Sequence, residues 1–399
     1  MKAGLGRFLR LWLPMLAVLF LGLQRAWLTG QADPWDWGMP AAILLAGMGL
    51  WLAPRGWPSL TWVAMGSVGT ALIFCTLAAL RAPGALASLG LATIALFAVL
   101  GGAALRGPWR PAGAILLLLT ALLLWRGPVQ PLIPVADRPK LSVITALPLF
   151  WGEPGKGATG PIDAPIITVL RTRFDVRPLD DPAQLAASGA RSLLLAQPRA
   201  LRPAQLVAID QWVRAGGRIL VLADPLLRWP SALPPGDRRR APSISLLGPL
   251  LAHWGFQPDG PPESPESRHF MPDGGLVTLS AVQPFLIDGD RGPHDGLVLR
   301  KRIGRGEVLL LGDADLIDDR LWLADPARPL DPRLWVADTP ARVTHWLGSD
   351  LPDQRHWMRS APDVTRALRW ALIAATGFAI FGAIALAREP NRQGIRNKS

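Results

Sequence analysis

Three aspartates stand where apolar segments end, and these residue types at these positions are suited to holding a polar ligand. Asp224 closes the run "RILVLADP", while Asp313 and Asp315 close the run within "GEVLLLGDADLIDD". The carboxyl ends of parallel strands share one edge of a sheet, where ligands collect in α/β proteins. The three carboxylates are therefore candidates to converge on a cation or another polar ligand. The interpretation that the sequence favours is that each one caps a turn by accepting hydrogen bonds from backbone amides.

A second group of charged residues lies in the segment "GDRRRAP", which places Arg238, Arg239 and Arg240 in a loop. Planar guanidinium groups bind carboxylates and phosphates through paired hydrogen bonds. The run therefore predicts contact with an anionic partner, either a lipid headgroup or an acidic protein surface. A solvated loop with no partner is the alternative.

Other chemistry finds little support in the sequence. The single cysteine, Cys75, lies in an apolar run, which excludes a disulfide framework, a cysteine zinc site and a thiol nucleophile. The five histidines lack paired spacing, so the histidines support no metal site. The loop "WGEPGKGATG" does not complete the phosphate-loop pattern Gly-x4-Gly-Lys-Ser/Thr, and Gly-x-Ser-x-Gly is missing. We predict no catalytic residue, no cofactor and no enzymatic activity.

The elements that would position these residues follow an alternating pattern. Strands are predicted for "KLSVITALPLFW", "DVRPLD", "SLLLAQP", "RILVLADP" and "GEVLLL", and helices for "APIITVLRTRF", "RPAQLVAIDQWVRAGG" and "SISLLGPLLAHWGF". In the second helix Leu206, Ile209 and Val213 share one face, and Gly216 and Gly217 follow its end. Strand, helix and strand with short links predict right-handed βαβ units and a doubly wound α/β sheet. The stretch from Gln257 to Asp295 is rich in Pro and Gly and predicts only weak strands.

The remainder of the chain is too apolar for a soluble protein. Half of the 399 residues are hydrophobic and 18% are charged. Apolar runs occur at about residues 11–28, 38–53, 58–80, 84–105, 111–125 and 367–387, near the ~20 residues that cross a bilayer. The net charge of +12 does not indicate nucleic-acid binding, because the arginines form no stripe along one element.

Basic residues flank the apolar runs and predict their orientation. With Lys2, Arg7 and Arg10 in the cytoplasm, Arg55 and the pair Arg106 and Arg110 also fall inside, and the acidic "QADPWDW" and the lone Arg81 fall outside. If one short apolar run does not cross the membrane, the α/β domain would instead lie in the cytoplasm. We predict a membrane region of about five transmembrane helices (residues 1–126) and an extracytoplasmic α/β domain (127–365). A C-terminal transmembrane helix (366–388) and a cytoplasmic basic tail (389–399) would follow. The protein would lie in the bacterial inner membrane.

Two segments carry a resemblance to a known family. The stretch "LLLAQPRALRPAQLVAIDQWVRAGGRILVLADP", together with "IGRGEVLLLGDADLIDD", resembles the auxiliary domain of certain ABC transport systems, the family of the gliding-motility protein GldG. The resemblance runs from Lys140 to about Asp319. It implies a flavodoxin- or amidotransferase-like fold without the catalytic set of class I glutamine amidotransferases. It also implies a separate ATP-binding subunit and an ABC permease as partners, although five N-terminal spans exceed what that family usually carries.

The function expected from these observations is a non-catalytic auxiliary or binding component of an ABC-type export or motility system. Its spans would contact the lipid bilayer and a permease. One alternative is a hydrolase of the cell envelope that uses the carboxylates at the sheet edge. The other is a purely structural membrane scaffold.

Overall fold

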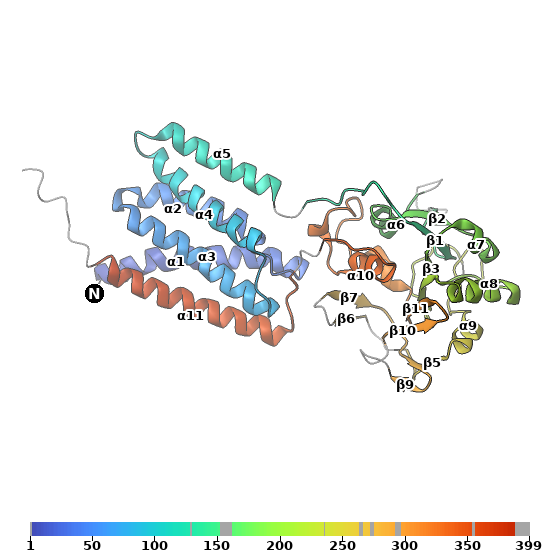
Figure 1. Cartoon of the computed structure of the whole chain (residues 1–399). Coiled ribbons are helices and arrows are strands. Elements are labelled where there is room, and N and C mark those ends of the chain that lie inside the picture. Colours follow the sequence, from blue (N-terminus) through green and yellow to red (C-terminus); the bar gives the residue numbers. More distant parts are fainter. Residues whose placement is uncertain are drawn as a thin grey trace, which may run out of the picture. The chain divides into compact units, whose positions relative to one another are not determined.

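A computed structural model gives the architecture of the chain (Figure 1). It describes residues 2–127, 130–151, 162–234, 236–262, 266–271, 275–291, 297–352 and 356–387. The chain divides into two compact units, one formed by Met1–Gln130 with Gln354–Ser399 and the other by Pro131–Asp353. The predicted basic tail at 389–399 and most of the loop "WGEPGKGATG" lie outside the described residues.

The first unit is a bundle of helices. Its members are α1 (Lys2–Thr29), α2 (Gly38–Leu52), α3 (Trp57–Ala79), α4 (Ala85–Leu105), α5 (Arg110–Arg126) and α11 (Ala361–Ala385), with short 3-10 helices η1 (Pro34–Trp37) and η2 (Ala53–Arg55). Four of them, α1, α3, α4 and α11, are long and apolar enough to cross a membrane. The other two have 15 and 17 residues, short of the ~20 that a bilayer core requires.

Small residues bring α11 close to its neighbours in this bundle. A stripe spaced by four residues on this helix is fully buried, and it consists of Ala367, Ala371, Ala375 and Ala379. Small side chains let helix backbones approach closely in a membrane, where packing drives association. The indole Nε1 of Trp62 on α3 donates a hydrogen bond of 2.9 Å to the carbonyl of Phe378.

Backbone contacts show which helix ends lie together in the bundle. Met358, just before α11, donates its amide to the carbonyl of Gly30 after α1, and Arg359 donates to the carbonyl of Ala78 near the end of α3. At the opposite end, the guanidinium group of Arg106, after α4, donates a hydrogen bond of 3.0 Å to the carbonyl of Leu50 in α2. Consecutive helices therefore run in alternating directions.

The second unit is built on a six-stranded sheet with the order β10-β11-β4-β3-β1-β2. Five strands run parallel, and β10 joins the edge antiparallel to β11. The strands are β1 (Lys140–Thr145), β2 (Asp175–Pro178), β3 (Ser192–Ala196), β4 (Arg218–Leu222), β10 (Val298–Ile303) and β11 (Gly306–Leu311). The chain leaves β1 for β2 on one side and later enters β3 on the other, so the strand order reverses at β1.

Helices cover both faces of this sheet. The α-helices of the unit are α6 (Pro165–Leu170), α7 (Leu185–Ser188), α8 (Pro203–Arg214), α9 (Gly248–His253) and α10 (Thr339–Trp346). Side chains alternate between the faces of a strand. In β4, Ile219 and Val221 accordingly join the core beneath α8 and α9, while Leu220 and Leu222 join the core on the α6 and α10 side.

Two smaller sheets lie in the stretch predicted to hold weak strands. One pairs β5 (Phe256–Pro258), β8 (Phe285–Ile287) and β9 (Asp290–Arg291), and the other pairs β6 (Ser267–Phe270) with β7 (Leu276–Leu279). The predicted long helix over "SISLLGPLLAHWGF" is wrong in extent, because α9 has only six residues. The strand predicted over "KLSVITALPLFW" is also shorter than expected and ends at Thr145.

The link from α8 to β4 matches the sequence pattern in detail. Pro203 occupies the first turn of α8, and Gln205 accepts the free amide of Arg202 through its side chain. Gly216 adopts a φ of 120°, which L side chains rarely adopt. The next residue, Gly217, leaves no room for a Cβ because the ring of Trp212 occupies that space. These two glycines stop the helix and start the strand.

Candidate functional site

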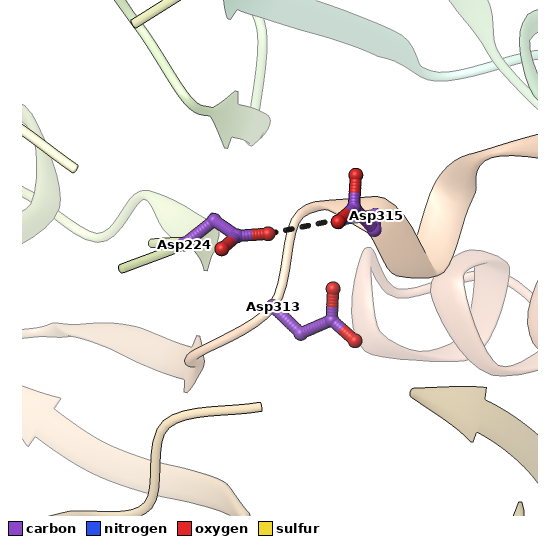
Figure 2. A group of neighbouring side chains, drawn as sticks. All are labelled: Asp224, Asp313 and Asp315. Carbon is purple, nitrogen blue, oxygen red and sulfur yellow. Dashed lines mark hydrogen bonds between the residues drawn. The ribbon is translucent and has the colours of Figure 1, made fainter. Parts of the chain in front are cut away.

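The three predicted aspartates lie at one edge of the sheet (Figure 2). Asp224 follows β4, and Asp313 and Asp315 follow β11. The two strands are parallel neighbours in which Leu222 pairs with Leu311. One carboxylate oxygen from each aspartate lies within 4.8 Å of the others. This aspartate cluster is almost completely buried, with exposed fractions of 0%, 0% and 1%.

Backbone amides already occupy most oxygens of the aspartate cluster. Asp224 accepts the amides of Leu226 (2.8 Å), Ala314 (3.0 Å) and Asp315 (3.3 Å). Asp313 accepts those of Ser280 (2.6 Å) and Leu316 (3.1 Å), and one oxygen of Asp315 accepts that of Arg228 (2.7 Å). Of the six carboxylate oxygens in this cluster, only Oδ1 of Asp315 has no hydrogen-bond partner among the described residues. The cluster thus joins three loops, as the turn-capping alternative expects, and its role in binding a ligand stays a prediction.

Burial also changes the protonation of the cluster. Desolvation raises the pKa of Asp224, and desolvation together with the nearby charge of Asp224 raises the pKa of Asp313 well above its ordinary value. Desolvation raises the pKa of Asp315 to about 7. Carboxyl groups in contact cannot all ionise at neutral pH, so the cluster retains protons. It is the one group of three potential metal ligands among the described residues, and its donor set would suit a hard cation.

Gln197 is a central residue of this edge that the sequence did not single out. It follows β3, is fully buried and has a φ of 42°, in the left-handed region. Its side-chain amide donates to the carbonyls of Asp224 (3.1 Å) and Pro242 (3.0 Å), while its Oε1 accepts the amide of Asp224 (3.0 Å). The sequence feature that could have identified Gln197 is its position as a polar residue directly after a fully apolar strand, in "LLLAQP".

A cavity of about 480 Å³ lies beside the aspartate cluster but does not include it. Its walls come from the loops after β1, β2, β3 and β4, so it lies where the strand order reverses, the usual ligand site of open α/β sheets. Arg239 and Arg240 line this β1–β3 cavity, whereas Arg238 does not. Arg199, which the sequence analysis missed, lines it as well.

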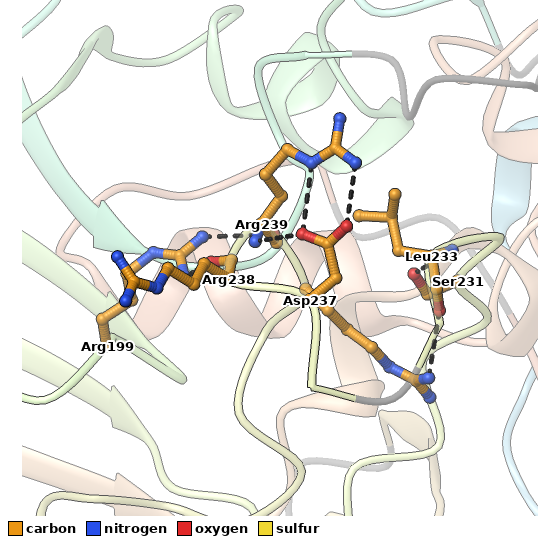
Figure 3. Close-up of polar contacts among 7 residues, drawn as sticks. Arg199, Ser231, Leu233, Asp237, Arg238 and Arg239 are labelled. Atoms are coloured by element: carbon orange, nitrogen blue, oxygen red, sulfur yellow. Dashed lines mark hydrogen bonds and ion pairs between the residues drawn. The ribbon is translucent and has the colours of Figure 1, made fainter.

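The loop that contains Arg238, Arg239 and Arg240, here called the arginine loop, is held in place by hydrogen bonds within the loop and from Arg199 (Figure 3). Asp237 binds Arg239 through its backbone amide (2.8 Å), Nε (3.2 Å) and Nη2 (2.8 Å). Arg199 donates to the carbonyls of Arg238 and Arg239, and Arg240 donates to the carbonyl of Leu233 (3.2 Å). Two residues of the predicted run of three arginines therefore line the cavity, Arg239 as the partner of Asp237 and Arg240 without an ion pair among the described residues, and Arg238 is exposed.

Comparison with protein families gives one match. Residues 138–260 match the model of a family described as an ABC-type uncharacterized transport system. The matched segment contains β1 to β5 and the arginine loop, and it ends before the strand that carries Asp313. A comparison with curated proteins found no match.

Similarity to solved structures is low. An exo-β-1,4-mannosidase from the Opitutaceae bacterium strain TAV5 has 11% identity and a TM-score of 0.32, over 61% of this chain and 40% of that enzyme. A β-galactosidase from Rahnella sp. R3 has 13% identity and a TM-score of 0.29, over 60% and 35% of the two chains. A β-galactosidase from the haloarchaeon Halorubrum lacusprofundi has 16% identity and a TM-score of 0.29, over 52% and 32%. The chain spans less than half the length of these enzymes, and similarity at this level supports neither a shared fold nor glycosidase activity.

Proposed function

We propose that this chain is a non-catalytic auxiliary component of an ABC-type transport system in the bacterial inner membrane. The family match over residues 138–260 carries the proposal. The α/β unit would be a doubly wound, amidotransferase-like domain that binds a ligand or couples partners, as in GldG-like proteins of export or gliding motility. The sequence contains no recognisable ATP-binding motif, so a separate ATP-binding subunit and a permease would complete the system.

Basic residues near the two ends of the chain favour a periplasmic position for the α/β unit, whereas arginines occur at both ends of the helical bundle. The start of α1 and the end of α11 lie at one end of the bundle; Lys2, Arg7 and Arg10 belong to this part of α1, and Arg388, Arg392, Arg396 and Lys398 follow α11 in the sequence. Positive residues favour the cytoplasmic side of a membrane. The opposite end, where α5 ends and α11 starts, would then lie in the periplasm, and the segment between these two helices is the α/β unit.

The strand ends support a binding role over a catalytic one. The strands β3 and β4 lead into Gln197 and Asp224, and both side chains are committed to hydrogen bonds with the backbone. The sole cysteine is buried in α3. A covalent mechanism needs an accessible nucleophile beside a base, and neither of these strand ends supplies one.

Purification of the tagged full-length chain from its native membrane in mild detergent tests the proposed partners. An ATP-binding subunit and a permease should be recovered in stoichiometric amounts, and a tag on the ATP-binding subunit should recover this chain in return. The same tag on an unrelated inner-membrane protein is the control. Recovery of the intact chain without any ATP-binding subunit, in both directions, would contradict the proposal.

The orientation has its own test. Alkaline phosphatase fused after Arg126 should be active, and a fluorescent protein fused after Ala387 should fluoresce, because the first position would be periplasmic and the second cytoplasmic. Fluorescence from a fusion after Arg126 would place the α/β unit in the cytoplasm and overturn the assignment.

A further inference from the structure

The β1–β3 cavity combines an apolar interior with unneutralised positive charge. Its volume of about 480 Å³ lies in the ~300–1,000 Å³ range of small-molecule sites. The apolar part includes Val143, Leu147, Phe150 and Leu233, all of which are buried, and the half-buried Trp229 packs against the same core. A ligand that enters this cavity would therefore bury an apolar body against these side chains.

The charged part of the lining is predominantly positive. Three arginines and one aspartate, Asp180, line the cavity. Asp237 forms an ion pair with Arg239, and hydrogen bonds from Arg239, together with the nearby charges of Arg239 and Arg199, lower the pKa of Asp237 to about 2. A ligand would therefore gain most of its electrostatic attraction from the other two arginines.

Arg199 and Arg240 keep their charge available for a ligand. In the part of the chain that the structure describes, the hydrogen bonds of both guanidinium groups go to backbone carbonyls, which are neutral. Each guanidinium has five N–H donors, so both retain donors beyond these contacts. The backbone contacts also hold the two groups in place, which lowers the entropy that binding must overcome.

We propose that the β1–β3 cavity binds a small molecule in which an anionic group is joined to an apolar body. Arg199 and Arg240 bind the anionic group, and Phe150 and Trp229 contact the body. This inference rests on the proposed function, in which the α/β unit binds its ligand without converting it. A soluble anion with an apolar body and an anionic lipid share this chemistry.

Three probes test the two halves of the site without any mutation. Equilibrium dialysis would use the full-length chain in phosphatidylcholine nanodiscs at fixed ionic strength, with empty nanodiscs subtracted. The probes are 1-naphthyl phosphate, 1-naphthol, which lacks the anion, and inorganic phosphate, which lacks the rings. We expect 1-naphthyl phosphate to bind at least tenfold more tightly than either of the others. Equal affinity for 1-naphthyl phosphate and 1-naphthol would overturn the proposal, as would absence of 1-naphthyl phosphate binding.

Variants then assign the anionic subsite. The double variant Arg199→Gln with Arg240→Gln should weaken binding of 1-naphthyl phosphate by roughly tenfold to a hundredfold, since it removes charge-assisted hydrogen bonds. It should leave 1-naphthol binding unchanged, which excludes collapse of the cavity. The control is Arg302→Gln with Arg305→Gln, which removes the same charge from exposed positions on the β10–β11 hairpin and should change the affinity less than twofold. Equal weakening in both double variants would overturn the assignment.

Competition distinguishes the two sources of ligand. Dihexanoylphosphatidic acid, a short-chain anionic lipid, should displace 1-naphthyl phosphate if the natural ligand is a lipid headgroup. If it does not displace the probe, the natural ligand is a soluble anion with an apolar body. Neither measurement involves an ATP-binding subunit, so failure of this inference and failure of the proposed transport role can be told apart.

Discussion

Replacement of Gln197 by Ala is expected to destabilise the α/β unit more than any surface substitution. The change removes three hydrogen bonds, two of which leave the backbone amide and carbonyl of Asp224 buried without their partner. An unsatisfied buried polar group costs about 1–3 kcal/mol. We therefore expect a loss of about 3–5 kcal/mol in the free energy of unfolding.

Replacement of Gln197 by Gly distinguishes the stability lost with the hydrogen bonds from the stability lost to backbone strain. The φ of 42° at this position favours Gly over Ala by about 1 kcal/mol. The Gly variant loses the same hydrogen bonds and should therefore be about 1 kcal/mol more stable than the Ala variant. The exposed Gln211 on α8 supplies a matched control, Gln211→Ala, which should stay within about 0.5 kcal/mol of the wild type.

Pulse proteolysis across a urea gradient, on the full-length chain in nanodiscs, measures these differences through the fraction of intact α/β unit. With a urea dependence of about 2 kcal/mol per M, the Ala variant should unfold at a urea concentration about 1.5–2.5 M lower than the wild type. A shift of less than 0.5 M (about 1 kcal/mol) would refute the inference that the hydrogen bonds of Gln197 to Asp224 and Pro242 stabilise the α/β unit. A Gly variant no more stable than the Ala variant would refute the argument from strain.

Three further predictions concern the other residues at this edge. Because the pKa of Asp315 rises from 3.8 to about 7 on folding, the folded state holds a proton that the unfolded state releases, and the free energy of unfolding should fall as the pH rises through this interval. The Asp315→Asn variant should show a smaller fall between pH 5 and 7.5 in the same urea assay, and an unchanged slope would contradict the assignment. Gly312→Ala should destabilise the unit by about 1–3 kcal/mol, because a Cβ there would overlap the carbonyl of Gln283, whereas Gly248→Ala has open space and should be nearly neutral. Asp315→Asn should also change the affinity for 1-naphthyl phosphate less than twofold, since the aspartate cluster does not line the cavity.

The central strands could be predicted because both of their faces are buried. Parallel strands covered on two sides appear as continuous apolar runs, and "SLLLA" and "RILVL" form β3 and β4 within the predicted segments. The edge strand β10 was missed because its sequence, "VLRKRI", exposes Arg300 and Arg302. The apolar run after β1 led to the opposite error, because it was predicted to continue the strand. Leu147, Leu149 and Phe150 are buried in a loop, and burial alone does not distinguish a loop from a strand.

The meeting of the three aspartates could be anticipated because each follows a strand of one parallel sheet. The pairing of β4 with β11 then brings Asp224 to Asp313 across 89 positions in the sequence. The role of Gln197 could not be anticipated, because its partners, Asp224 and Pro242, lie 27 and 45 residues away on other loops. Arg199 was missed for the same reason, since the loop that makes it part of a cavity comes later in the chain.

The same edge of the sheet thus contains two groups of charged residues that differ in how many of their hydrogen-bonding atoms already have partners. The aspartate cluster has given nearly all of its acceptor oxygens to backbone amides, so binding a ligand there would require breaking hydrogen bonds that connect three loops. Arg199 and Arg240 face a cavity with donors to spare, and a ligand would add contacts without removing any. Since binding is favoured where few existing interactions are lost, Arg199 and Arg240, in the loops after β3 and β4, are better placed than the aspartate cluster to receive a ligand. Asp224 holds these two loops together through Gln197.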